Sequence, residues 1–286
     1  MPLESVHDRT ELADLLRRTP DLRAYELGDL DDRFWPYTSW YRRGDALALL
    51  FHGAGMPILL ALDTPDRSEP LAELLTELLP LLPRRFYAHL SPGLEKALEP
   101  AYEAESNGPH LKMALTDPAR LAPADRSDEP AGAVEPAGAI ETVGAIETVG
   151  AIETVETVEL TTADLPELNA FYELAYPAHS FAPSMVANGP YLGLRRGGEL
   201  LAVAGVHVWS PGYRVAALGN VATHPRVRGK GLATTVVSAL CRRLLATVDR
   251  VALNVKAENG AAVGLYQRLG FSPVAEYTEL TFTARD

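Results

Sequence analysis

The sequence has a single cysteine, Cys241, among its 286 residues, so the chain cannot form an internal disulfide. It also lacks any apolar run approaching the roughly 20 residues that a transmembrane helix needs. The first residues show no charged-then-apolar pattern of a secretory signal. We therefore expect a cytoplasmic protein with no membrane association. For Cys241 itself, which falls on a predicted helix with no histidine near it in sequence, a buried apolar role is expected.

Positive charge is scarce, because 38 Asp and Glu face 26 Lys and Arg, which gives a formal net charge of −12. The excess lies early in the chain: residues 1–117 have 20 acidic and 12 basic residues, whereas residues 156–286 have 11 and 12. This distribution argues against nucleic acid as a partner. The length and the 47% hydrophobic content indicate a globular chain with room for two domains.

The most specific pattern runs through residues 221–233, where an apolar strand leads through a basic, glycine-bearing turn into a helix. The residues after the turn repeat their apolar side chains at helical spacing. Unpaired N–H groups and the positive end of the helix dipole would meet at the turn, which favours binding of a pyrophosphate. The turn contains two overlapping copies of one pattern, Arg226-x-x-Gly229-x-Gly231 and Arg228-x-x-Gly231-x-Ala233.

Two other phosphate-binding loops can be excluded. A P-loop needs a glycine where this chain has His224, and the dinucleotide fingerprint needs a third glycine where it has Thr234. What remains resembles the coenzyme A pyrophosphate loop of the GNAT superfamily of N-acyltransferases. A second segment, Asn254-Val255-Lys256-Ala257-Glu258-Asn259 followed by Leu265-Tyr266-Gln267-Arg268-Leu269-Gly270-Phe271, resembles the strand, helix and final strand of the same superfamily.

Three parts of the chain are predicted. Residues 158–286 have the element order of a catalytic GNAT domain, and residues 118–157 read as a low-complexity linker containing Gly-Ala-Ile-Glu-Thr-Val three times. Residues 1–117 have a similar order of elements without a phosphate turn, so they are predicted to be a degenerate GNAT-like domain, with an unrelated cap domain as the alternative. The whole chain then resembles the FR47-like subgroup, whose closing segment residues 109–113 match.

The expected fold class is therefore α/β of the α+β kind, a tandem GNAT-like acyl-CoA N-acyltransferase fold with a mixed twisted sheet flanked by helices in each half. Predicted helices cover 8–18, 71–79, 92–98, 163–175 and 261–269, together with the one after the phosphate turn. Predicted strands cover 39–42, 46–52, 58–62, 85–89, 110–115, 158–161, 191–194, 200–207, 213–223, 251–255 and 272–282.

The resemblance implies that acetyl-CoA, or another acyl-CoA, is the co-substrate and that no metal is needed. It implies that Tyr266 protonates the departing thiolate, although a tyrosine in an apolar helix is also an ordinary core residue. Asn259 is expected to contact the cofactor or simply to cap its helix. The residues expected to bind the cofactor are Val221, Thr223, Arg226, Arg228, Gly229, Lys230, Gly231, Leu232, Ala233, Thr234 and Asn259.

A general base is missing from the expected place, because residues 214–218 read Arg-Val-Ala-Ala-Leu where many relatives carry a glutamate. His207, His179 and Glu173 are candidates, as are a water chain and a group from the acidic first half. The predicted function is acyl transfer, most simply of acetyl, from the CoA thioester to the amine of a small molecule or peptide. The alternative is a non-catalytic module that senses acyl-CoA and binds a partner through its first domain.

Overall fold

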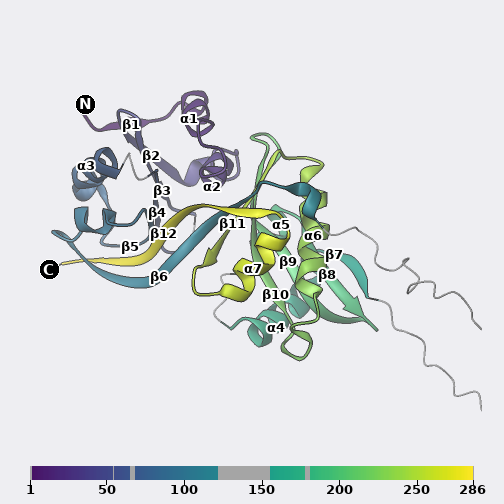
Figure 1. Cartoon of the computed structure of the whole chain (residues 1–286). Helices are drawn as coiled ribbons and strands as arrows, with labels where there is room; N and C mark the ends of the chain where they lie inside the picture. The colour runs from purple at the N-terminus through teal and green to yellow at the C-terminus, as the bar shows by residue number, and fades with distance from the viewer. Residues whose placement is uncertain (1, 54, 65–67, 122–154, 178–180, 286) are drawn as a thin grey trace, which may run out of the picture.

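The computed structural model describes residues 2–53, 55–64, 68–121, 155–177 and 181–285, and within these ranges twelve strands form one sheet (Figure 1). The repeats of the predicted linker and the candidate base His179 lie outside the described residues. The sheet order is β1-β2-β3-β4-β5-β12-β6-β11-β10-β9-β8-β7.

The first half contains β1 (Glu4–Val6), α1 (Arg9–Leu16), α2 (Ala24–Gly28), η1 (Trp35–Tyr37), β2 (Thr38–Arg43), β3 (Ala46–Phe51), β4 (Ile58–Ala61), α3 (Ser68–Leu78), η3 (Leu79–Leu81), β5 (Arg85–Leu90), η4 (Leu94–Ala97), β6 (Tyr102–Leu115) and η5 (Pro118–Arg120). The second half contains β7 (Glu156–Leu160), η6 (Thr162–Asp164), α4 (Leu165–Ala175), α5 (Pro183–Asn188), β8 (Tyr191–Arg196), β9 (Glu199–Ser210), β10 (Val215–Thr223), η7 (Pro225–Val227), α6 (Leu232–Leu245), β11 (Arg250–Lys256), α7 (Gly260–Arg268) and β12 (Phe271–Ala284).

The predicted mixed sheet with flanking helices is confirmed, and nearly every predicted element is present. The helix predicted over residues 92–98 is instead the short 3₁₀ turn η4, which follows Gly93 in the left-handed region at φ 89°. Three elements escaped prediction, namely β1, α2 and α5. They have between three and six residues, too few to show a period in the sequence.

Helices cover both faces of the sheet, and the alternation of strand residues decides which face each one covers. In β10, Ala216 and Leu218 pack in the cluster that contains the apolar stripe of α6, whereas Val215 packs with α1 and α2 on the opposite face. The α2 helix therefore belongs to the first half in sequence but packs on strands of the second half.

The two halves also exchange strands, as the crossing of β6 and β12 in Figure 1 shows. Strand β6 belongs to the first half but pairs with β11 and β12, while the C-terminal strand β12 pairs with β5. The sequence did not reveal this exchange. Because each half completes the sheet of the other, neither β6 nor β12 leaves an unpaired edge at the junction.

Candidate functional site

The site begins where two parallel strands separate. Strands β10 and β11 pair from Val215↔Arg250 to Leu218↔Leu253, and their ladder then stops. Beyond this point the edge of β10 that faces β11 has no strand partner among the described residues, along Gly219 to Thr223. Backbone N–H and C=O groups on such an edge can pair with an extended ligand. Open α/β sheets bind ligands at this end of their parallel strands.

A bulge in β10 produces the separation. Asn220 lies in the left-handed region at φ 54°, and the pairing of β10 with β9 shifts register between Gly219 and Ala222. The bulge is held from the side of α4 and β8, since the Tyr172 hydroxyl donates to the Asn220 carbonyl at 2.7 Å and the Asn220 amide donates to the Tyr191 hydroxyl at 3.0 Å. Sequence reasoning missed this bulge, although asparagine is enriched among residues with positive φ.

The predicted phosphate turn connects β10 to α6 with an open backbone. Gly229 and Gly231 have φ values of 77° and 81°, and nothing lies within 4 Å of where a β-carbon would be at either position. Gly231 is the N-cap of α6, and the N–H groups of residues 229–234 have no hydrogen-bond acceptor among the described residues. Several unpaired donors at the start of a 14-residue helix suit a pyrophosphate, so the turn fits the predicted coenzyme.

The three basic side chains of this turn differ in what they contact. The Arg228 guanidinium donates to the carbonyl of Ala175, the last residue of α4, at 2.6 Å, and to the Thr223 carbonyl at 3.3 Å. Arg226 forms an exposed ion pair with Glu199. Lys230 is exposed and has no partner among the described residues. Arg228 therefore fixes the turn against α4, and Lys230 is the charge most available to a ligand.

The remaining predicted cofactor residues line the same region. Val221 and Thr223 lie half-buried on the unpaired edge of β10, and Leu232, Ala233 and Thr234 form the first turn of α6. Asn259 lies at the start of α7, where its side chain accepts the Ala262 N–H at 3.2 Å. The capping role considered for Asn259 is thus what the contacts show.

Tyr266 lies on α7 in the core that includes α6, with 8% of its surface exposed and its ring edge-on to Phe271. No group in the described part of the chain hydrogen-bonds its hydroxyl. Burial, followed by the influence of Cys241 and Tyr176, raises the pKa of Tyr266. The hydroxyl therefore stays protonated at neutral pH, as a proton donor must. Cys241 is itself buried, as expected.

The candidate bases differ in environment. His207 lies over Gly219 beside the separation, where a β-carbon on that glycine would meet its ring at 1.9 Å. Burial lowers the pKa of His207 to about 4, and the charge of Glu279 opposes this shift. Its imidazole is therefore neutral at pH 7 and weakly basic. Glu173 is exposed on α4, and His224 caps the turn by accepting the Arg226 N–H at 3.2 Å.

A buried polar cluster that sequence reasoning missed lies on the same face as α2, where β5, β12 and β6 run side by side. Its centre is Glu279, whose carboxylate accepts a hydrogen bond from the Tyr87 hydroxyl and one at 3.0 Å from Tyr277. The His89 and His110 Nε2 atoms lie 3.5 and 3.4 Å from this carboxylate. The signal in the sequence is alternation within strands, Tyr87-x-His89 and Tyr277-x-Glu279.

An ion network beside this cluster joins the halves. The Lys112 ammonium on β6 donates to the Leu22 carbonyl at 2.9 Å and lies 3.5 Å from the Glu26 carboxylate on α2. Arg23 pairs with Glu26 at 3.1 Å and approaches Asp63 at 3.6 Å. Two buried cations thus face two buried carboxylates. Their charges balance within the network.

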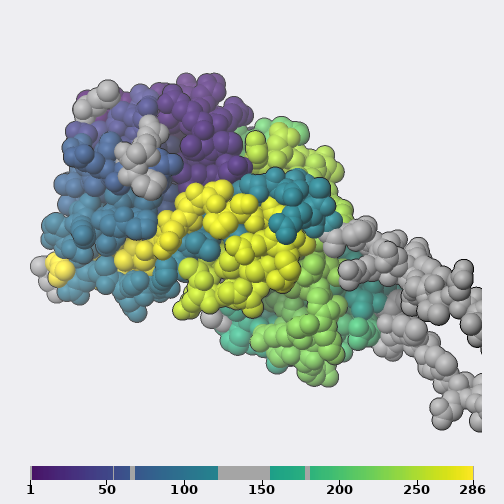
Figure 2. Space-filling model, viewed as in Figure 1, coloured from purple at the N-terminus to yellow at the C-terminus, as the bar shows by residue number. Residues whose placement is uncertain are grey.

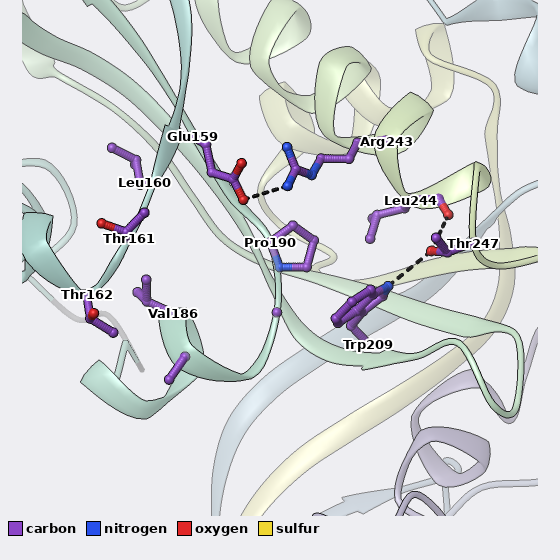
Figure 3. Close-up of a pocket in the computed structure, with 12 residues that line it drawn as sticks. Glu159, Leu160, Thr161, Thr162, Val186, Pro190, Trp209, Arg243, Leu244 and Thr247 are labelled. Atoms are coloured by element: carbon purple, nitrogen blue, oxygen red, sulfur yellow. Dashed lines mark hydrogen bonds and ion pairs between the residues drawn. The ribbon is translucent and has the colours of Figure 1, made fainter.

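A groove of about 460 Å³ lies elsewhere, between β7, α5 and the C-terminal end of α6 (Figure 3). Its charged residues, Glu159 and Arg243, pair with each other at 2.5 Å. The Trp209 indole N–H donates to the Thr247 hydroxyl at 3.2 Å. Because it lies at the opposite end of α6 from the phosphate turn, this groove is not part of the site described above.

Comparison with known proteins agrees with this geometry. Residues 155–271 match the acetyltransferase (GNAT) family model. These residues form a GNAT domain. A search of curated proteins found no match. None of the helices in the described ranges is long and apolar enough to cross a membrane, and no group of three or more metal-ligating side chains occurs in those ranges.

Solved structures resemble the whole chain, beyond the GNAT domain. A Drosophila protein covers 98% of both chains at 15% identity with a TM-score of 0.66. A tandem GNAT protein from the clavulanic acid biosynthesis pathway also covers 98% of both chains, at 18% identity and a TM-score of 0.56. A GNAT-family protein from Novosphingobium aromaticivorans covers 84% of this chain and 89% of its own at 21% identity and a TM-score of 0.50. The predicted resemblance to tandem GNAT proteins is confirmed.

Proposed function

We propose that the protein is an acyl-CoA-dependent N-acyltransferase, most simply an acetyltransferase, that acylates the amine of a small molecule or peptide. The observation that carries the proposal is the conjunction of an open strand separation with a phosphate turn at one end of it. The N–H groups of residues 229–234 would hold the pyrophosphate, and the free edge of β10 would pair with the pantetheine arm.

Tyr266 is the proposed acid of this reaction. The C–N bond forms as the C–S bond of the thioester breaks, and the departing thiolate then needs a proton. A phenol whose pKa is raised by burial keeps its proton until a strong base such as a thiolate forms beside it. The hydroxyl is free of protein acceptors in the described residues, so it can turn toward the sulfur.

The test is a Tyr266→Phe variant assayed for thiol release from acetyl-CoA with a panel of primary amines. General acid catalysis contributes roughly 100- to 10,000-fold, so we expect kcat to fall by about 100-fold or more. The dissociation constant for acetyl-CoA should stay unchanged, because the turn and the β10 edge are untouched. Tyr41→Phe, in a half-buried tyrosine of the first half, is the matched control and should keep full activity.

Two results would contradict the proposal. Full activity of Tyr266→Phe would remove Tyr266 from the reaction. A wild type that binds acetyl-CoA but transfers its acyl group to no amine would favour the alternative, a non-catalytic acyl-CoA-binding module. That alternative is based on the absence of a carboxylate from the segment Val215–Leu218 of β10.

A further inference from the structure

The polar cluster around Glu279 and the reaction site share one space. Burial, followed by the charges of Glu279 and Tyr266, raises the pKa of Tyr25 on α2. Tyr176 in turn contributes to the raised pKa of both Tyr266 and Tyr87, each of which is raised mainly by burial. Two tyrosines thus lie within electrostatic reach of the proposed acid on one side and of the cluster on the other.

Glu279 also faces the separation of β10 and β11. Its charge acts on His207, which belongs to β9 on the far side of that separation. Strand β6 supplies His110 next to Lys256, the last residue of β11, and His110 lies beside Tyr277 of β12. The carboxylate is therefore at the opening through which an acceptor would approach the thioester.

The negative charge of Glu279 is not cancelled by its surroundings. Burial lowers the pKa of His89 to about 4, so its imidazole is neutral at pH 7. Lys112, the nearest buried cation, is already paired with Glu26. The hydroxyls of Tyr87 and Tyr277 donate hydrogen bonds, which stabilise the carboxylate without neutralising it.

The cluster is open on one side and aromatic on the others. The Glu279 side chain is 16% exposed, so a small ligand can reach it. The ring of His89 lies 4.9 Å from that of Tyr277 and 5.7 Å from that of Tyr87, centroid to centroid. A carboxylate among ring faces attracts an organic ammonium through its charge and through cation–π contacts. On the neighbouring β11, the Asn254 Oδ1 atom is buried without a hydrogen-bond partner and could accept from the same ligand.

We propose that Glu279, walled by Tyr87, Tyr277 and His89, binds the ammonium group of the acceptor. The substrate class is then a cationic alkylamine, and neutral arylamines or alcohols are excluded. This inference rests on the proposed function for its biological role, but the binding site it describes can be measured without turnover.

The test measures binding of n-butylamine, benzylamine and putrescine at pH 7 to the full chain saturated with CoA, with benzyl alcohol as the uncharged analogue of benzylamine. We expect at least one of the amines to bind and benzyl alcohol not to bind. Charge-assisted hydrogen bonds contribute about 1.5–3 kcal/mol, so Glu279→Gln should weaken amine binding by roughly 10- to 100-fold. Glu276→Gln changes an exposed glutamate on the same strand and should leave binding unchanged.

Glu279→Asp provides a second variant in case loss of the charge disturbs folding. It keeps the charge but withdraws the carboxylate by one methylene, and it should bind the amine more weakly than wild type. The site is disproved if no amine binds to wild type, or if Glu279→Gln binds as tightly as wild type. Acetyl-CoA titrated into the same samples separates this failure from failure of the proposed function, because the cofactor would still bind when only the ammonium site is wrong.

Discussion

The two halves of the molecule place a parallel strand pair at the same point and finish it differently. In the first half, β4 and β5 pair from Ile58↔Tyr87 to Ala61↔Leu90. The Ser91 hydroxyl then binds both the N–H of Asp63, at 3.0 Å, and its carbonyl, at 3.1 Å. In the second half no such bond follows Leu218 and Leu253 among the described residues. The same scaffold is thus closed in one half and open in the other.

The polar groups beside each pair differ in the same way. In the first half Asp63 is buried and faces Arg23, and it belongs to the ion network that fastens α2 to β6. In the second half the N–H groups after Gly229 remain unpaired and face outward. We infer that the first half has its polar groups committed to joining the halves, while the second keeps them for a ligand.

The largest way to disturb this comparison is to remove the cation of the junction. Lys112→Ala leaves Glu26 with Arg23 as its only cationic partner in a fully buried place. Breaking one side of a buried ion pair costs about 3–5 kcal/mol of unfolding free energy. Urea unfolding should show this loss, whereas Lys96→Ala, at an exposed lysine of the first half, should lie within about 0.5 kcal/mol of wild type. A loss below 1 kcal/mol would mean that the network does not hold the halves together.

A smaller effect is expected from opening the closed half. Ser91→Ala removes both bonds to Asp63 and leaves a buried N–H unpaired, which should cost about 1–3 kcal/mol in urea unfolding. The variant should gain no acetyl-CoA binding in the first half, since no glycine turn follows β4 in the described residues. Appearance of a second binding event would show that closure alone separates the two halves. The matched control is Ser272→Ala, an exposed serine on β12.

The local patterns of the chain predicted most of the fold and part of the site. The phosphate turn was visible because its glycines and its helix are contiguous in sequence, as were Asn259 and Tyr266 on one helix. The Glu279 cluster could not be predicted, because its members come from β5, β6 and β12 and meet only through the strand exchange. The closure at Ser91 was equally hidden, since a serine after a strand carries no distinctive pattern. The roles of Arg226 and Arg228 also depended on partners far away in sequence, Glu199 and Ala175.

The central claim is that one coenzyme binds, at the open turn of the second half. Calorimetric titration of acetyl-CoA into wild type, into Gly229→Glu/Gly231→Glu and into Gly93→Glu/Gly198→Glu tests it. All four glycines have φ between 77° and 89° and open space around the absent β-carbon, so the two double variants impose similar backbone strain.

We predict one acetyl-CoA per chain in wild type and in the Gly93→Glu/Gly198→Glu control. In the turn variant, carboxylates in place of the pyrophosphate should weaken binding by more than about 100-fold. Equal affinity in both double variants, or two molecules bound per chain, would contradict the account.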